Sequence, residues 1–398
     1  MHKINHLNNN LELEGKRVLL RVDFNVPINN GSITESSRIE KVLPTINFLI
    51  KKNAKIIIIS HIGRPKGKIV PNLTLKPIAE KVSKLINKNV FFLSESIGLT
   101  TIEKSKKISN GEVLMLENLR FNKEEELNEE SFAKKLSKLG DIYVNEAFSC
   151  SHRAHASVSK ITHYIKPFAG IELIKEINSI NMLINGAKKP VTCIIGGSKI
   201  SSKIGILDNL IKKMETIVIV GAMANNFIRY KGYNIGKSTF EKGAENLEDK
   251  IIKLAKVNNC SLIIPQDVLV SKNLNPPGQV KNLAEIDDTD LILDIGNKTI
   301  ETISDIIDSS KTILWNGPAG YFEIEEFSRG SNKIAKKIVE NTKNKSLTSI
   351  AGGGDTVAAI NKFGYSKGFT YLSTAGGAFL ELLEGKILPG IKALETNE

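Results

Sequence analysis

At 398 residues the chain is long enough for two domains, because a single domain usually runs to about 100–200 residues. Apolar residues make up 41% and charged residues 25%, which excludes a disordered or fibrous protein. The aliphatic runs are far shorter than the roughly 20 residues that span a bilayer. The start of the chain shows no apolar secretion signal. We therefore expect a cytoplasmic protein without a membrane partner.

The formal net charge of +12 keeps a nucleic-acid-binding protein open as an alternative function. The lysines lie scattered between apolar segments, and aromatic residues make up only 6% of the chain, too few for the stacking platforms that bind single strands. The three cysteines match no zinc or disulfide spacing, so reduced thiols are expected.

Short β-branched runs alternate with amphipathic stretches along the whole chain. This alternation predicts repeated β–α units, and the high apolar content of the runs predicts parallel sheets buried on both faces. In chain order the predicted strands are residues 18–22, 55–59, 113–116, 142–144, 191–195, 217–220, 262–264, 291–294, 312–315, 349–351 and 370–372.

A helix is predicted over residues 168–184, where isoleucines recur at helical intervals, and a Gly- and Pro-containing stretch follows it. We interpret it as a connection between two lobes. The expected division is a first lobe over 1–167, the connecting helix over 168–185, a second lobe over 186–384, and a C-terminal segment over 385–398.

Charged and polar side chains follow the predicted strands of the first half, at the strand ends where doubly wound sheets bind ligands. In order, these residues are Asp23, Asn25, Arg38, His61, Arg64, Arg120, His152 and Arg153. Arginine forks bind phosphate and carboxylate groups in pairs of hydrogen bonds. The set therefore predicts a site for a small ligand with several negative charges.

Glycines follow the predicted strands of the second half: Gly196-Gly197, Gly221, Gly296, Gly317, residues 352–354, and Gly376-Gly377. Glycine lets the backbone approach a ligand, and a helix that begins there favours phosphate. Lys199 and Lys203 follow the first of these turns, and Asp355 offers a carboxylate for a magnesium ion that bridges phosphates. The second half thus predicts a nucleotide site.

Each of these residues also has a plain structural interpretation. A histidine after a strand often has a structural hydrogen bond and no ligand. Asp355 could likewise serve as the cap of the helix that follows it. No Gly-x-Gly-x-x-Gly follows a predicted strand, which weakens the alternative of a dehydrogenase. Residues 232–238 have the wrong spacing for a Walker A loop, and the acidic run 287–290 favours a turn over an ion site.

Several longer motifs occur in a fixed order, and on them the chain resembles the phosphoglycerate kinase family over essentially its whole length. They are RVDFNVP (21–27), SHIGRPKG (60–67), LENLRF (116–121), NEAF (145–148), HRAH (152–155), GGSKI (196–200), WNGP (315–318), GGGDT (352–356) and STAGGA (373–378).

The resemblance implies two Rossmann-like lobes with parallel sheets, joined by a helix and with a cleft between them, that carry one substrate each. It also implies a C-terminal segment that returns to the first lobe. It implies a 3-phosphoglycerate site made of Asp23, Asn25, Arg38, His61, Gly63, Arg64, Arg120 and Arg153. It implies an ADP or ATP site made of Lys203, Gly296, Asn316, Glu323, Gly353, Gly354, Asp355 and Thr356, with Mg²⁺ on Asp355. Arg38, Lys199, Gly376 and Gly377 would surround the transferred phosphoryl group.

The implied reaction is reversible phosphoryl transfer between 1,3-bisphosphoglycerate and ADP, giving 3-phosphoglycerate and ATP. We expect a glycolytic enzyme that acts as a monomer, closes by hinge motion at the ends of the 168–184 helix and near Ser373-Thr374, and needs no general base. Ala375 stands where the family usually has glycine, so the local backbone geometry is expected to differ from that of the family. Ala319, Tyr321 and Glu172 also depart from the family and are expected to affect packing only.

Overall fold

The chain is described by a computed structural model over residues 3–29 and 31–395. It forms two compact units: unit 1 contains Met1–Asn178 and Ile387–Glu398, and unit 2 contains Ser179–Lys386. Both units are α/β structures, as the sequence predicts. No helix in the described ranges is long and apolar enough to cross a membrane.

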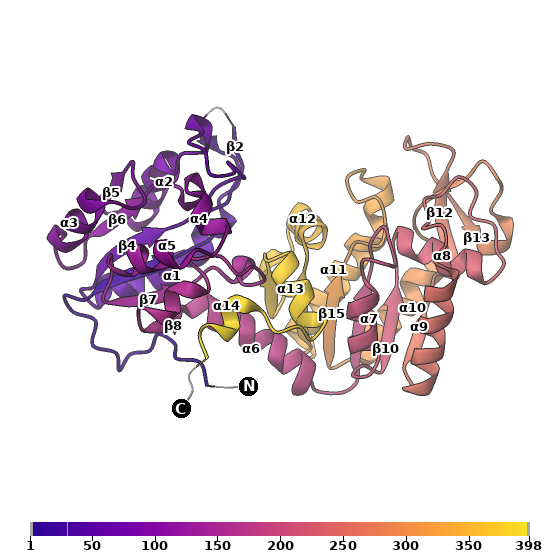
Figure 1. The fold of residues 1–398 in the computed structure, drawn as a ribbon. Coiled ribbons are helices and arrows are strands. Elements are labelled where there is room, and N and C mark those ends of the chain that lie inside the picture. Colours follow the sequence, from indigo (N-terminus) through magenta and orange to yellow (C-terminus); the bar gives the residue numbers. More distant parts are fainter. Residues whose placement is uncertain (1–2, 30, 396–398) are drawn as a thin grey trace. The chain divides into compact units, whose positions relative to one another are not determined.

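The framework of unit 1 is a parallel sheet with six strands among the described residues (Figure 1). From edge to edge the strands are β5 (Val90–Leu93), β6 (Val113–Leu116), β4 (Lys55–Ile59), β1 (Arg17–Arg21), β7 (Ile142–Asn145) and β8 (Pro167–Ala169). The helices of this part of the chain are α1 (Ser37–Lys51), α2 (Lys76–Ile86), α3 (Leu99–Lys107), α4 (Lys123–Glu126), α5 (Glu130–Ser137), α6 (Ile171–Asn185) and α14 (Pro389–Lys392). A short hairpin joins β2 (Ile28–Asn29) to β3 (Ser32–Ile33).

The core of unit 1 forms where apolar faces meet. The four isoleucines of β4 are fully buried, as expected of a central strand covered on both faces. In α1, Ile39, Val42 and Ile46 recur at helical spacing and belong to the same apolar cluster as the strands. This packing holds the carboxyl ends of the strands in fixed places.

Unit 2 contains a second parallel sheet, again with six strands in the described part, and a smaller antiparallel sheet. The parallel order is β11 (Ser261–Ile263), β10 (Thr216–Ile219), β9 (Val191–Ile195), β15 (Thr312–Asn316), β16 (Thr348–Gly352) and β17 (Tyr371–Ser373); the antiparallel order is β13 (Gln279–Asn282), β12 (Asp267–Ser271) and β14 (Leu291–Ile295). The helices are α7 (Ile204–Leu210), α8 (Ala222–Tyr230), α9 (Glu245–Val257), α10 (Asn297–Ser309), α11 (Arg329–Asn344), α12 (Gly354–Lys362) and α13 (Gly377–Leu383).

Each parallel sheet has a point where the strand order reverses. In unit 1 the chain leaves β1 towards β4 but leaves β7 towards β8, and in unit 2 it leaves β9 towards β10 but leaves β15 towards β16. Loops that diverge in this way open a crevice beyond the carboxyl ends of the two neighbouring strands, where doubly wound folds bind ligands. The residues after β1, β7, β9 and β15 are therefore the first candidates for function.

The structure corrects two predicted elements. The strand expected at residues 291–294 is β14 of an antiparallel sheet, in which it pairs with β12. The other two strands of that sheet, β12 and β13, were not predicted, and β13 is short, polar and mostly exposed. The helix expected from residue 168 begins at Ile171, because Phe168 belongs to β8, a three-residue strand that starts with a proline.

The C-terminal segment lies in unit 1, where the amide of Gly390 donates to the Ser151 carbonyl at 2.8 Å. Helix α6 contains the division between the units, which falls between Asn178 and Ser179. The domain boundaries expected at residues 167 and 185 stay a prediction. All three cysteines are buried and free, in agreement with the expected reduced thiols.

Candidate functional site

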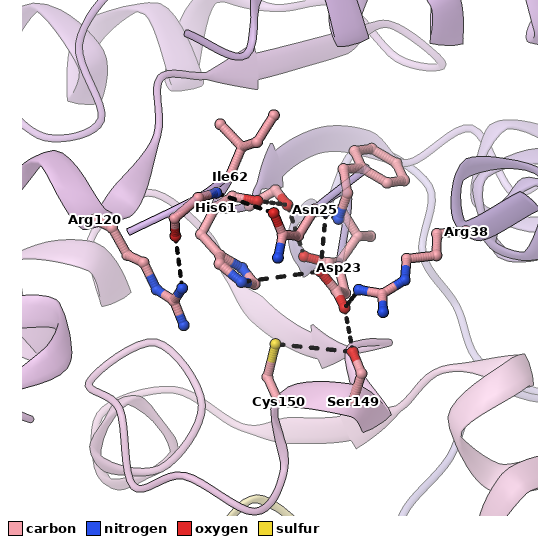
Figure 2. A network of polar contacts seen from close by, with 12 residues as sticks. Asp23, Asn25, Arg38, His61, Ile62, Arg120, Ser149 and Cys150 are labelled. Carbon is pink, nitrogen blue, oxygen red and sulfur yellow. Dashed lines mark hydrogen bonds and ion pairs between the residues drawn. The ribbon is translucent and has the colours of Figure 1, made fainter. Parts of the chain in front are cut away.

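Asp23, directly beyond β1, is the centre of the polar network in unit 1 (Figure 2). One carboxylate oxygen is 2.6 Å from Nη1 of Arg38 and also accepts a hydrogen bond from the Ser149 hydroxyl. The other oxygen accepts a hydrogen bond from the backbone N–H of Asn25 at 3.0 Å. The carboxylate thereby joins the β1 loop to α1 and to the loop after β7.

His61 follows β4 and is 3% exposed. Arg21, fully buried at the end of β1, contacts Nδ1 of His61 through its Nη2 at 3.2 Å. Because a guanidinium can only donate, Nδ1 accepts and the imidazole proton is on Nε2, which faces Asp23 at 4.0 Å. Burial, followed by the charges of Arg21 and Arg120, holds the pKa of His61 well below its usual value, so the ring is neutral.

Arg120 comes from the short helix after β6 and is 5% exposed. Its Nη1 donates to the Gly63 carbonyl at 2.8 Å, and the Gly63 amide donates to the Asn25 side chain at 3.0 Å. Glu126 lies 3.4 Å from the Nε of Arg120. The loops after β1, β4 and β6 are thus linked by hydrogen bonds around one cationic wall.

Two predicted arginines lie outside this bonded network. Arg153 donates from Nε to Nε2 of His152 at 3.1 Å and is half-buried, while Arg64 is exposed. The remaining predicted residues of unit 1, namely Asp23, Asn25, Arg38, His61, Gly63 and Arg120, are brought together.

The same cluster offers the one group of side chains, among those described, with the spacing of a metal site: ligand atoms of Asp23, His61 and Cys150 lie within 4.8 Å of one another. Two features oppose a cation there. The Nε2 of His61 carries a proton instead of a lone pair, and the guanidiniums of Arg21 and Arg38 already face the group. Burial also raises the pKa of the Cys150 thiol. The electrostatics therefore favour an anionic ligand.

In unit 2 the turns after β9 and β15 touch each other. A side chain on Gly317, whose φ is +108°, would collide with the backbone of Gly196. Asn316, at the end of β15, accepts from Nζ of Lys203 at 2.6 Å and donates to the Gly352 carbonyl at 2.6 Å. Burial lowers the pKa of Lys203. The turns after β9, β15 and β16 are held as one surface.

Helix α12 begins beside this surface. Gly353, with a φ of +103°, precedes it, and a Cβ there would meet the Asn316 amide. The Gly317 amide donates to the Thr356 hydroxyl at 2.7 Å, while Gly354 and the Asp355 carboxylate are exposed in the first turn. Lys203, Asn316, Gly353, Gly354, Asp355 and Thr356 are therefore brought together, and Asp355 is the exposed oxygen donor of the group.

A cavity of about 510 Å³ lies next to these turns. Its wall includes Asp355, Glu323, Tyr321 and parts of α8 and β14. Tyr321 is 42% exposed and lines the cavity. The expectation that it affects packing only stays a prediction. Gly296 is not part of the wall: it precedes α10, where a Cβ would collide with the Asp267 carboxylate.

The predicted transfer residues are placed as follows. Lys199 is exposed in the turn after β9, Gly376 precedes α13, and Gly377 begins it. Ala375 is 2% exposed and its amide is 3.3 Å from the Ser373 hydroxyl, so the alanine is accommodated in a buried turn.

Some residues of these sites were not singled out from the sequence, among them Arg21, Ser149 and Asn225. Arg21 could have been found, because it is a charged residue at the end of an otherwise apolar strand. Burying a charge costs free energy unless the charge is paired, so such a residue indicates a polar site. Ser149 and Asn225 carried no local signal, since their partners lie far away along the chain.

Comparison with known proteins identifies the same family throughout. A family profile described as phosphoglycerate kinase matches residues 8–386. The chain is 47% identical over 389 residues to the phosphoglycerate kinase of Wolbachia sp. subsp. Brugia malayi (strain TRS), covering 97% of each chain. It is 45% identical over 388 residues to that of Bartonella bacilliformis, again covering 97% of each.

Solved structures agree. The phosphoglycerate kinase structure from Coxiella burnetii superposes with a TM-score of 0.88 at 40% identity and covers 97% of both chains. The one from Pyrococcus horikoshii OT3 gives a TM-score of 0.82 at 30% identity and covers 98% of both chains.

Proposed function

The chain belongs to the phosphoglycerate kinase family, and from that premise we propose which of its residues carry each part of the reaction. As a phosphoglycerate kinase it is a nucleotide-dependent phosphotransferase of glycolysis that acts on small-molecule substrates. Family membership sets aside the dehydrogenase alternative. We assign the transfer between 1,3-bisphosphoglycerate and ADP to side chains of both units.

In our assignment, unit 1 holds 3-phosphoglycerate through Asp23, Asn25, Arg38, His61, Gly63, Arg64, Arg120 and Arg153. The observation that carries this assignment is the cationic wall around Asp23, in which Arg38 uses one guanidinium nitrogen on the carboxylate and stays 32% exposed. Its remaining donors can bind an anion in the fork geometry that suits phosphate and carboxylate groups. Asp23 and the neutral His61 would receive the substrate hydroxyl.

We assign the nucleotide to unit 2, with Lys203, Gly296, Asn316, Glu323 and residues 353–356 as its binding residues. Its phosphates would lie over the turns that carry Lys203, Asn316 and residues 353–356, and Glu323 lies in the wall of the cavity. A hard divalent ion such as Mg²⁺ is bound by one or two carboxylates, waters and substrate phosphates, and the single exposed carboxylate of Asp355 fits that donor set. When bound, Mg²⁺ would neutralise phosphate charge. Lys203 would place a further positive charge beside the same oxygens.

The chemistry needs positive charge and no base. In the direction of ATP consumption the nucleophile is the carboxylate of 3-phosphoglycerate, which is ionised at neutral pH because its pKa is near about 4. Phosphoryl transfer spreads negative charge over the equatorial oxygens, so Arg38, Lys199 and the backbone at Gly376 and Gly377 would act by electrostatic stabilisation and positioning. Since the two substrates are assigned to different units, transfer would require hinge motion that brings them together and excludes water.

We further propose a cytoplasmic monomer with no nucleic-acid or membrane partner. Each substrate is a small dissolved metabolite, and each assigned site is built from the residues of one unit. Size-exclusion chromatography with light scattering would report the mass, and a dimer would contradict the proposal.

The assignment is tested by ATP consumption that depends on both 3-phosphoglycerate and Mg²⁺. Asp355→Ala should lower turnover by about a hundredfold and weaken the Mg²⁺ dependence, because an exposed oxygen donor to the metal is lost while the fold is untouched. Asp249→Ala removes another exposed carboxylate of unit 2, paired with Lys253, and serves as the control. Equal activity of the two variants would refute the role of Asp355.

A further inference from the structure

The cavity of unit 2 has mostly apolar walls. Ile228 of α8, Val268 of β12 and Leu293 of β14 line it, together with the ring of Tyr321. Asp355, at the nucleotide end proposed above, belongs to the same wall. A flat apolar group joined to phosphates, such as a nucleobase, suits a space of this kind.

Asn225 is a buried polar residue of this wall. It lies on α8 three residues before Ile228, is 1% exposed, and lines the cavity. Its Nδ2 donates to the Thr239 carbonyl at 2.9 Å, which fixes the orientation of the amide, because a carbonyl accepts only from the NH₂ group. Its Oδ1 is then left without a hydrogen-bond partner in the described structure.

The neighbouring residue shows that this gap is not a property of the helix. Asn226 is also buried on α8, but its Nδ2 donates to the Glu241 carbonyl and to Glu248, and its Oδ1 accepts from the Glu241 amide. Asn226 does not line the cavity. Of two adjacent asparagines, the one at the cavity is the one with an unused acceptor, and an unpaired buried acceptor is costly to keep.

Two other polar side chains of the wall are already engaged. The carboxylate of Asp294 accepts from the Gly330 amide at 2.6 Å and from the Ile295 amide at 2.9 Å. The Ser238 hydroxyl accepts from the Ile292 amide at 2.8 Å. Unlike these two, Asn225 keeps a buried acceptor atom without a partner in the described structure.

We propose that Asn225 selects the nucleobase: its Oδ1 accepts a hydrogen bond from the exocyclic amine of adenine. Guanine and hypoxanthine present a carbonyl oxygen at that position, which would meet Oδ1 acceptor to acceptor. The proposal deepens the nucleotide assignment and rests on it. Asn225 thereby determines specificity and takes no part in the transfer step.

The test is a comparison of four nucleotides on the full chain by titration calorimetry: ADP, GDP, IDP and purine riboside diphosphate, which lacks the amine. The wild type should bind ADP roughly tenfold tighter than the other three. Asn225→Leu, of similar size but without an acceptor, should bring the four affinities together. Ratios measured on one preparation are independent of any inactive fraction, so a partly unfolded variant still answers the question.

Asn226→Leu is the matched control, because it removes the same side chain from the same helix away from the cavity. It should destabilise the fold while keeping the preference for ADP. If the wild type and Asn225→Leu show the same ADP preference, or the wild type shows none, base selection by Asn225 is refuted while the nucleotide assignment stands. If the wild type binds none of the four, the nucleotide assignment fails together with the inference.

Discussion

In our assignment each unit binds an anionic substrate, but the two units do so by different means. In unit 1 the crevice is built from charged side chains, of which Arg21, Arg120 and Asp23 are at least nine-tenths buried. In unit 2 the turns consist largely of glycine and backbone, with Lys203 as a partly buried charge. Charged side chains form directed hydrogen bonds that select the shape of a small ligand. Backbone amides without side chains in the way let a chain of phosphates approach closely.

Each way of building a site constrains the residues of its unit. Charged groups in unit 1 must be paired with one another to be buried at all, which couples Arg21, His61, Asp23 and Arg38 into one network. In unit 2 the close approach of the turns depends on positions that no other residue fits, such as Gly317 and Gly353. Substitutions should therefore fail for electrostatic reasons in one unit and for steric reasons in the other.

The largest effect is expected in unit 1. Arg38→Ala should lower turnover by about a hundred- to a thousandfold, since a charge assigned to the transition state is lost. It should also lower the free energy of unfolding by about 1–3 kcal/mol, because the buried Asp23 carboxylate loses its arginine partner and keeps only Ser149 and the Asn25 backbone amide. Steady-state kinetics and urea unfolding measure the two quantities.

Arg17→Ala is the control for that change. Arg17 also forms an ion pair with an aspartate of unit 1, Asp141, but lies at the opposite end of β1. It should leave turnover within a few-fold of the wild type. An Arg38→Ala enzyme as active as this control would overturn the assignment and the contrast between the units.

The histidines also distinguish the units, because they occur in unit 1 and are absent from residues 179–386. Burial, followed by the charge of Arg120, lowers the pKa of His155 to about 3. Below about pH 6.5 this histidine is protonated in the unfolded chain but stays neutral in the folded chain. The free energy of unfolding therefore falls by about 1.4 kcal/mol for each pH unit below 6.5, which is about 2 kcal/mol at pH 5.

His155→Gln should remove this part of the acid sensitivity. Urea unfolding at a series of pH values would show a shallower slope between pH 6.5 and 4 for the variant than for the wild type. Hydrogen exchange would locate the wild-type loss in unit 1. Identical slopes would mean that the pKa of His155 is not lowered by the fold.

The smallest effect concerns the steric side of the comparison. Gly353→Ala should raise the KM for ATP by roughly tenfold, because a Cβ at a φ of +103° would displace the side-chain amide of Asn316, which we assign to the nucleotide site. Gly364→Ala, where φ is also positive at +76° but a Cβ would meet nothing within 4 Å, should leave the KM unchanged. An unchanged KM for ATP in Gly353→Ala would show that the turns of unit 2 move to accommodate an added Cβ, which would contradict the steric prediction.

Much of this protein could be read from the sequence because the signals are local. Strands such as 55–59 and 191–195 are marked by runs of β-branched residues, and the residues that follow the strands, including Asp23, His61 and Asn316, end up in the polar clusters of the structure. In a parallel sheet the carboxyl ends of the strands share one edge, so knowing the strands is enough to collect these side chains.

The tertiary structure decided what depends on partners distant in the chain. The orientation of the Asn225 amide is set by Thr239, the tautomer of His61 by Arg21, and the antiparallel sheet by the pairing of β12 with β13 and β14. Nothing in the local pattern distinguishes Asn225 from Asn226. Hydrogen-bond satisfaction is a property of the folded neighbourhood, since a donor and an acceptor meet only after the elements that carry them have packed.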